Sequence, residues 1–232
     1  MKSNNEKMKE VSRAYPVYRL AIFDVDGTLV DSFPLFVKLL NQYAQKYQYH
    51  LLDEQRIEHL RDFPPRKIRR ELGLSRLQAI RLAVDCKRGM QKTEDKPEVF
   101  SGIDTLLKDL KQQGYRLAIV TSNSVENCRV SLGEERLALF DWVQSNASIY
   151  GKQRQIKKVL RAAQCEPAHA IYIGDQITDI HSAQHLNMPI AAVTWGFNNA
   201  SALAEAKPTY LCQSIDQLTR CLMTVPQPIE ES

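Results

Sequence analysis

The sequence has little of what marks fibrous, disordered, membrane-spanning or disulfide-bonded proteins. Its 232 residues include only 9 Gly and 10 Pro, which excludes a collagen-like or low-complexity composition. No apolar run approaches the roughly 20 residues of a membrane-spanning helix, and residues 1–16 are too polar for a secretory signal. The five cysteines are odd in number and form no C-x-x-C pair, which argues against a disulfide framework or a zinc site. We expect a cytoplasmic globular protein with a disordered tail over 1–16.

The chain also lacks a strong excess of charge of one sign. Its net charge of +4 is far below that of typical nucleic-acid-binding proteins, so we expect neither nucleic acid nor a membrane as a partner. Residues 33–99 hold 14 Lys and Arg against 9 Asp and Glu, so this one segment carries the whole positive excess. Its surface is therefore suited to an anionic partner.

Short apolar runs alternate with amphipathic helical patterns along most of the chain. The runs 20–23, 117–120, 170–173 and 190–193 are apolar on both faces, as buried parallel strands are. Between two of them, Ile103, Leu106, Leu107 and Leu110 recur at helical spacing. This alternation predicts an α/β fold with a doubly wound parallel sheet.

Residues 33–99 interrupt this alternation with helical patterns alone. One helix is predicted from the apolar face between Phe36 and Tyr47, and another from Leu77, Ile80 and Val84. The segment is therefore predicted to be an inserted helical domain. The sequence makes no prediction about the oligomeric state of the protein.

Two pairs of carboxylates follow two of the predicted strands. Asp24 and Asp26 stand in Asp24-Val25-Asp26-Gly27-Thr28, and Asp175 and Asp179 follow Gly174. Because parallel strands end at one edge of the sheet, the four carboxylates converge there. Two unit charges about 4 Å apart repel by roughly 4 kcal/mol at an effective dielectric of 20, and a hard cation such as Mg²⁺ removes that cost. A turn capped by Asp side chains, and a helix N-terminus stabilised by Asp179, are the alternatives.

A third strand ends in hydroxyl and amide side chains. Thr121, Ser122 and Asn123 are candidate ligands of phosphate oxygens, although an ordinary helix cap is favoured when these residues are taken alone. Lys152, at the start of a later helical pattern, is a candidate for a fixed positive charge at the same edge.

Together these elements resemble the haloacid dehalogenase superfamily of hydrolases, whose ordered motifs are D-x-D-G-T, a Thr or Ser after a strand, a Lys, and G-D-x-x-x-D. The resemblance spans about residues 18–223. It implies a Rossmann-like core over 17–32 and 100–232, and an all-helical cap domain over 33–99. The segments 29–32 and 195–198 are similar to those of the phosphoglycolate-phosphatase branch.

The same resemblance implies roles for four side chains. Asp24 is the nucleophile and forms an aspartyl-phosphate, which water hydrolyses. Asp26 protonates the leaving alkoxide and then activates that water. Thr121 hydrogen-bonds the phosphoryl group, and Lys152 neutralises it together with Asp24.

The implied cofactor is Mg²⁺, held by Asp24, the backbone carbonyl of Asp26, and Asp175, with Asp179 supporting the coordination shell. The implied activity is phosphatase action on a small anionic phosphorylated metabolite. A sugar-phosphate mutase or nucleotidase of the same fold, or a non-catalytic regulatory binding protein, is the alternative. The mutase branch has a histidine about a dozen residues after the nucleophile, where this chain has Phe36, so hydrolysis is favoured.

The basic segment 61–70 of the insertion is a candidate substrate-binding region. Arg61 and Arg66 are the predicted contacts to a second negative charge on the substrate, because Arg binds carboxylates in a bidentate manner. A solvated basic helix face is the alternative.

Overall fold

A six-stranded parallel sheet forms the centre of the protein. The computed structural model describes residues 18–93, 95–145 and 151–223, so the predicted tail lies outside the described residues. The sheet has the order β5-β4-β1-β6-β7-β8, and every neighbouring pair is parallel. The strands are β1 (Leu20–Phe23), β4 (Arg116–Val120), β5 (Trp142–Gln144), β6 (Ala170–Gly174), β7 (Ile190–Val193) and β8 (Tyr210–Cys212). Four of them coincide with the predicted strands, which confirms the α/β class.

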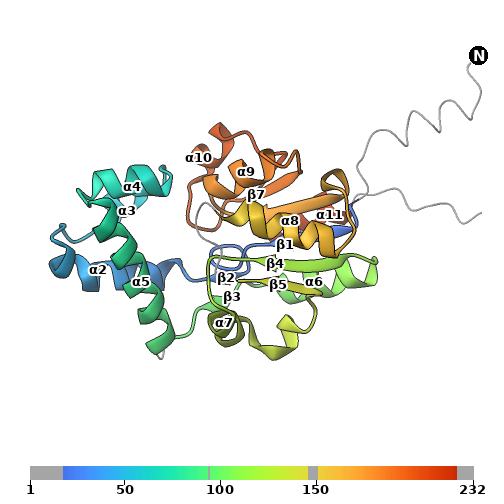
Figure 1. Ribbon diagram of the computed structural model, residues 1–232, viewed down its shortest axis with the longest axis horizontal. Coiled ribbons are helices and arrows are strands. Elements are labelled where there is room, and N and C mark those ends of the chain that lie inside the picture. Colours follow the sequence, from blue (N-terminus) through green and yellow to red (C-terminus); the bar gives the residue numbers. More distant parts are fainter. Residues whose placement is uncertain (1–17, 94, 146–150, 224–232) are drawn as a thin grey trace, which may run out of the picture.

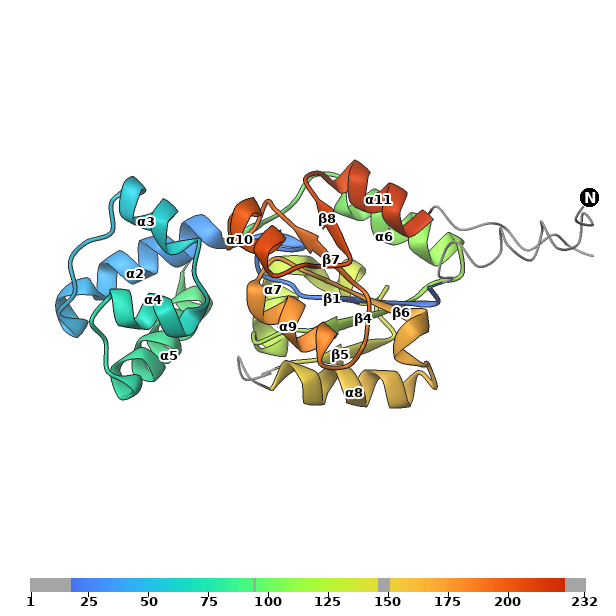
Figure 2. The ribbon, with the colours of Figure 1, turned by 90° about the horizontal axis from the view of Figure 1, so that it is seen from above.

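Helices cover both faces of this sheet (Figures 1 and 2). Along β1, Ala21 and Phe23 pack on one face, whereas Leu20 and Ile22 pack on the other. The first face is covered by α6 (Ile103–Gln112), α7 (Val125–Leu137) and α11 (Ile215–Met223). The second is covered by α8 (Lys152–Ala162), α9 (Ile177–Gln184) and α10 (Ala200–Glu205). Burial on both faces explains why the strands are apolar throughout.

The segment between β1 and α6 forms a second, helical lobe, which lies beside the carboxyl ends of the strands (Figure 2). It holds α2 (Phe33–Tyr47), α3 (Glu54–Leu60), α4 (Pro65–Glu71) and α5 (Arg76–Lys92), here called the insert. Two short antiparallel strands, β2 (Val30–Asp31) and β3 (Glu98–Val99), pair where the chain leaves and re-enters the core.

The insert has a small apolar core of its own, and α5 is the helix predicted from Leu77, Ile80 and Val84. Leu39 and Tyr47 of α2 are buried there with Leu82 and Cys86 of α5. The apolar face from which this helix was predicted is open to solvent, with Leu77, Ile80 and Val84 56%, 63% and 43% exposed. Two apolar stripes compete on this helix at the same spacing, and the sequence pattern does not say which one meets α2.

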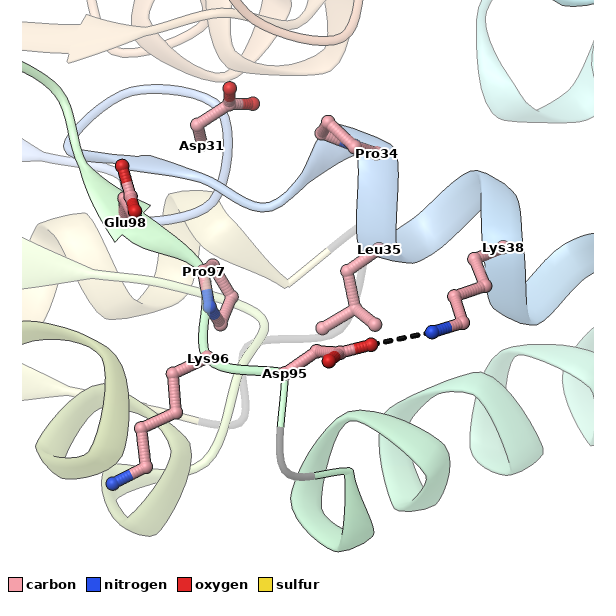
Figure 3. Close-up of a pocket in the computed structure, with 8 residues that line it drawn as sticks. All are labelled: Asp31, Pro34, Leu35, Lys38, Asp95, Lys96, Pro97 and Glu98. Atoms are coloured by element: carbon pink, nitrogen blue, oxygen red, sulfur yellow. Dashed lines mark hydrogen bonds and ion pairs between the residues drawn. The ribbon is translucent and has the colours of Figure 1, made fainter.

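An open pocket of about 320 Å³ lies between the two chain crossings (Figure 3). It is lined by Asp31, Pro34, Leu35 and Lys38 on one side and by Asp95, Lys96, Pro97 and Glu98 on the other. An exposed ion pair, Lys38–Asp95, crosses it at 2.5 Å. The pocket lies at the junction of insert and core and contains none of the converging site carboxylates. Among the described residues, no helix is both long and apolar enough to cross a membrane.

Candidate active site

The site lies where β1, β4 and β6 end at the same edge of the sheet. β1 pairs directly with β6, with Phe23 beside Ile173, and the Asp24 amide continues this ladder to the Ile173 carbonyl at 2.9 Å. The residues that follow the two strands, Asp24 and Asp175, therefore emerge side by side. Thr121 follows β4 on the other side of β1 and is fully buried.

Three carboxylates and one ammonium form a buried cluster at this edge. One carboxylate oxygen from each of Asp24, Asp175 and Asp179 lies within 4.8 Å of the other two. Lys152, 3% exposed, donates to Asp24 Oδ2 and, at 2.5 Å, to Asp179 Oδ1. Asp179 Oδ2 accepts from the Gln176 amide at 3.1 Å, so this residue also caps α9. The structure thus brings together three of the four carboxylates that were predicted to converge, all but Asp26, and adds Lys152 to them.

Two hydrogen bonds hold the Asp175 carboxylate. Its Oδ1 accepts from Thr28 Oγ1 at 2.9 Å, and its Oδ2 accepts from the Phe197 amide at 2.7 Å. Two glycines make this approach possible, because a Cβ on Gly27 or Gly196 would lie 2.2 or 2.3 Å from Asp175 Oδ2. Gly27 also has φ +74°, which a side chain would strain. The glycine of the D-x-D-G-T motif, Gly27, is therefore required by the close approach of the Asp175 carboxylate.

The electrostatics of the cluster fit a divalent cation. Burial, reinforced by the charges of Asp179 and Asp24, raises the pKa of Asp175 well above its usual value. Burial and Asp24 raise the pKa of Asp179 to about 6, against the opposing effect of Lys152. Burial alone would lower the pKa of Lys152, but Asp179 and Asp24 outweigh it and hold that pKa well above its usual range. One ammonium leaves the carboxylates undercompensated, and hard oxygen donors at this spacing suit Mg²⁺.

Asp26 stands apart from the cluster, with a different partner. Its Oδ2 accepts from Asn123 Nδ2 at 2.9 Å, and Asn123 Oδ1 accepts from Asn127 Nδ2 at 2.5 Å. Burial and the neighbouring charge of Asp24 raise the pKa of Asp26 to about 6, although the Asn123 hydrogen bond opposes this. A carboxyl group with such a pKa exchanges protons near neutral pH, which is what a general acid and base requires.

The loop after β4 caps the helix that follows it, whereas its role in binding phosphate stays a prediction. Ser124 Oγ accepts from the Asn127 amide at 3.2 Å and so caps α7, which agrees with the ordinary helix cap expected at this strand end. Thr121 Oγ1 accepts from the Asn123 amide at 3.1 Å, which fixes the loop beneath the site. Ser122 is exposed at the rim, whereas Asn123 is buried and supports Asp26.

The insert reaches the core on both sides of the site. Next to β7, Arg61 donates to the carbonyls of Gly196 and Phe197 at 2.9 and 3.2 Å. Next to β4, Lys87 of α5 donates to the Ser122 carbonyl at 3.3 Å. Arg66 is exposed in the first turn of α4. The structure therefore places Arg61 against the core, with its guanidinium already engaged by backbone oxygens.

Sequence reasoning missed Lys87 and the roles of Asn198 and Asn199, which follow β7. Asn198 is 4% exposed, and both asparagines hydrogen-bond to the insert. Gly196 and the pair Asn198-Asn199, which follow shortly after the end of β7, are residues typical of a tight loop and are the signal that the sequence offers here.

Comparison with known proteins agrees with this geometry. Residues 21–193 match the family described as haloacid dehalogenase-like hydrolase. The phosphoglycolate phosphatase of Synechococcus elongatus is 34% identical over 202 residues, which cover 87% of this chain and 95% of that protein. Phosphoglycolate phosphatase 1 of Pseudomonas aeruginosa is 25% identical over 229 residues, with 88% and 79% covered.

A solved haloacid dehalogenase-like hydrolase from Streptococcus pneumoniae shares the fold. Its TM-score to this chain is 0.71, at 23% identity, with 87% of this chain and 96% of that chain covered. The likeness therefore extends over the core and the insert together.

Proposed function

We propose that this chain, which belongs to the haloacid dehalogenase-like hydrolase family and is a phosphoric monoester hydrolase, cleaves a small anionic phosphate ester through an aspartyl-phosphate on Asp24. The observation that supports the mechanism is that two neighbouring carboxyl groups have different partners. Asp24 is paired with Lys152, whereas Asp26 has its pKa raised to about 6 and is held by Asn123. One is suited to attack, and the other to proton transfer.

The first half of the reaction uses both groups. Asp24 attacks phosphorus, the bond between phosphorus and the ester oxygen breaks, and the leaving alkoxide takes the proton of Asp26. Asp24 is oriented for this by two donors, because its Oδ1 accepts from the Val25 amide at 2.8 Å and its Oδ2 faces Lys152. Thr121 and Lys152 bind the phosphoryl oxygens as charge develops on them.

In the second half, Asp26 takes a proton from water. The water oxygen attacks phosphorus, the bond to Asp24 breaks, and inorganic phosphate leaves. Both carboxyl groups are then as they were at the start. A bound divalent cation, held by Asp24, the carbonyl of Asp26 and Asp175 with Asp179 in support, supplies positive charge that neutralises the phosphoryl oxygens.

The substrate belongs to the class of small phosphorylated carboxylic acids. The supporting observations are the names of the relatives, which are phosphoglycolate phosphatases, and the basic insert beside the site. The insert acts as a cap that covers the crevice. Arg66 recognises the second charge, whereas Arg61 docks the insert on the carbonyls of Gly196 and Phe197. A cytoplasmic setting agrees with the five cysteines, all of which are free thiols.

A substrate panel tests this proposal. The purified protein is assayed with Mg²⁺, and separately with EDTA, against 2-phosphoglycolate, hexose and nucleoside monophosphates, pyrophosphate and p-nitrophenyl phosphate. We expect release of inorganic phosphate, a preference for the acidic ester, and loss of turnover with EDTA. Isomerised sugar phosphate without phosphate release would indicate a mutase instead. Binding without turnover of any ester would indicate a regulatory protein.

A further inference from the structure

The loop after β7, residues 195–199, holds one of the cluster carboxylates. The Phe197 amide donates to Asp175 Oδ2 at 2.7 Å, and the Asn198 amide donates to the Asp175 carbonyl at 3.3 Å. The side chain of Asn198 adds a third link, because its Oδ1 accepts from the Ile177 amide at 3.0 Å, two residues after Asp175. The position of Asp175 therefore depends on the position of this loop.

The same loop is also the main attachment of the insert. Asn198 Nδ2 donates to the carbonyls of Arg61 and Phe63, at 2.6 and 3.2 Å, and the Asn199 amide donates to the Arg61 carbonyl at 3.2 Å. The Phe197 ring packs edge-on against Phe33 of α2, with the ring centroids 5.2 Å apart. The insert thus binds the segment that fixes Asp175.

Asn198 is the one side chain in this loop whose hydrogen bonds reach both sides. Its Nδ2 donates to two carbonyls of the insert and its Oδ1 accepts from one amide of the core, so both polar atoms of the side-chain amide are engaged. Because Asn198 is only 4% exposed, water does not replace a lost partner. Displacement of the insert would leave the amide group unsatisfied or pull it away from Ile177. The loop has little freedom to move toward Asp175, because Gly196 already packs against that residue.

We propose that Asn198 is a positioning residue that couples docking of the insert to the placement of Asp175, so that a divalent cation at the carboxylate cluster and the docked insert stabilise each other. The inference rests on the proposed function for the identity of the cation site. Coupling of this kind is reciprocal: if docking tightens cation binding, the cation must tighten docking by the same factor.

Asn199 provides a matched control. Its side chain also reaches the insert, donating to the Glu58 carbonyl and to Asp62 Oδ1 at 3.2 and 3.1 Å. Unlike Asn198, it has no hydrogen bond to Asp175 or to Ile177 among the described contacts. Asn199→Ala therefore weakens docking and leaves the link to the carboxylate cluster intact.

The experiment measures cation binding and docking separately in the full chain. The Mg²⁺ affinity is obtained from the rise of the thermal unfolding midpoint with Mg²⁺ concentration, and docking from hydrogen exchange at the amide of residue 199. In the wild type we expect saturating Mg²⁺ to slow that exchange about fivefold or more. In Asn198→Ala we expect the Kd for Mg²⁺ to rise about tenfold and the Mg²⁺ effect on exchange to disappear. Excess Mg²⁺ should restore kcat in this variant.

The outcomes separate this inference from the proposed function. Asn199→Ala should bind Mg²⁺ within about twofold of the wild type, and an equal loss in both variants would mean that Asn198 only holds the insert. Wild-type exchange at residue 199 that is indifferent to Mg²⁺ would overturn the coupling, and this needs no variant to fold. If the wild type does not bind Mg²⁺ at all, the proposed cation site is wrong, and the coupling falls with it.

Discussion

The ion pairs of the carboxylate cluster in the core and those of the insert lie in opposite surroundings. In the core, the side chains of Lys152, Asp24 and Asp179 are at most 4% exposed and pair with one another. In the insert, the pair Lys38–Asp95 lies in solvent, with side chains 58% and 62% exposed. Removing one partner of a buried pair costs about 3–5 kcal/mol, whereas an exposed pair contributes about 0–1 kcal/mol. The core keeps its charges where a reaction needs them, and the charges of the insert can differ with little cost to the fold.

The two lobes also differ in how their apolar surface is used. Both faces of the sheet are covered by helices, whereas α5 of the insert exposes Leu77, Ile80 and Val84. A lobe with a small core, attached through a few hydrogen bonds, moves more easily than a sheet packed on both sides. This comparison supports the proposal that the chemical step takes place in the core and that the insert recognises and covers the substrate.

The largest expected effect is that of Asp24→Asn. The nucleophile is lost while the shape of the side chain is kept, so kcat should fall by about four orders of magnitude or more. The thermal unfolding midpoint should change little, because Lys152 keeps Asp179 as a buried counter-ion. The measurement is phosphate release under saturating Mg²⁺, with mass spectrometry to exclude deamidation back to Asp.

Asp31→Asn is the matched control, because Asp31 is an exposed carboxylate seven residues away in β2. It should keep turnover close to that of the wild type. Substantial activity in Asp24→Asn would contradict the assignment of the nucleophile and, with it, the placement of the chemistry in the core.

Asp26→Asn should have the next largest effect, a fall in kcat of about 10²–10⁴. The loss should be greater for an alkyl phosphate than for p-nitrophenyl phosphate, because a nitrophenolate leaves without protonation. Mg²⁺ affinity should be spared, since the backbone carbonyl of residue 26 remains. Equal losses for both esters would show that Asp26 does not protonate the leaving group.

The buried carboxylates should make the metal-free protein less stable as pH rises. The pKa values of Asp26 and Asp179 are raised from 3.8 to about 6, so between these pH values the folded chain holds more protons than the unfolded chain. The free energy of unfolding therefore falls as pH rises through this window, by up to about 3 kcal/mol for each group. Mg²⁺ should restore the loss at pH 7–8.

Asp85 in the insert changes the free energy of unfolding with pH in the opposite direction. Lys46 lowers the pKa of Asp85, so the stabilisation from this carboxylate is lost as pH falls. The measurement is therefore the difference in unfolding free energy between the wild type and Asp179→Asn in EDTA, followed from pH 4 to 7. This difference should decline with rising pH. A difference that stays constant would mean that Asp179 is not held at a raised pKa.

The core site was more predictable from the sequence than the insert. Asp24 and Asp175 follow apolar strands, and parallel strands end at one edge, so their convergence follows from the fold alone. The strands β5 and β8 have three residues each, too few for a hydrophobic pattern, and were not predicted. The outer strands of the sheet therefore came only from the structure.

The links between the lobes could not be predicted, for a physical reason. Asn198 joins residues 61 and 63 of the insert to Ile177 of the core, and such contacts depend on the relative position of two lobes that no local pattern encodes. In the same way, the sequence offered α5 two apolar stripes, and only packing against α2 selects Leu82 and Cys86. Whether Arg61 and Arg66 touch substrate stays a prediction.

The smallest effect tests that prediction, and the structure sharpens it by separating the two arginines. Arg66→Ala should lower kcat/KM about tenfold for 2-phosphoglycolate and leave p-nitrophenyl phosphate unchanged, because one charge-assisted hydrogen bond is worth about 1.5–3 kcal/mol. Arg61 binds the carbonyls of Gly196 and Phe197, so Arg61→Ala should weaken docking and lower kcat/KM for both esters. Unchanged kcat/KM for both esters in Arg66→Ala would mean that this part of α4 is a solvated surface. Another cation of the insert, such as Lys87 beside Ser122, would then be the candidate for substrate recognition.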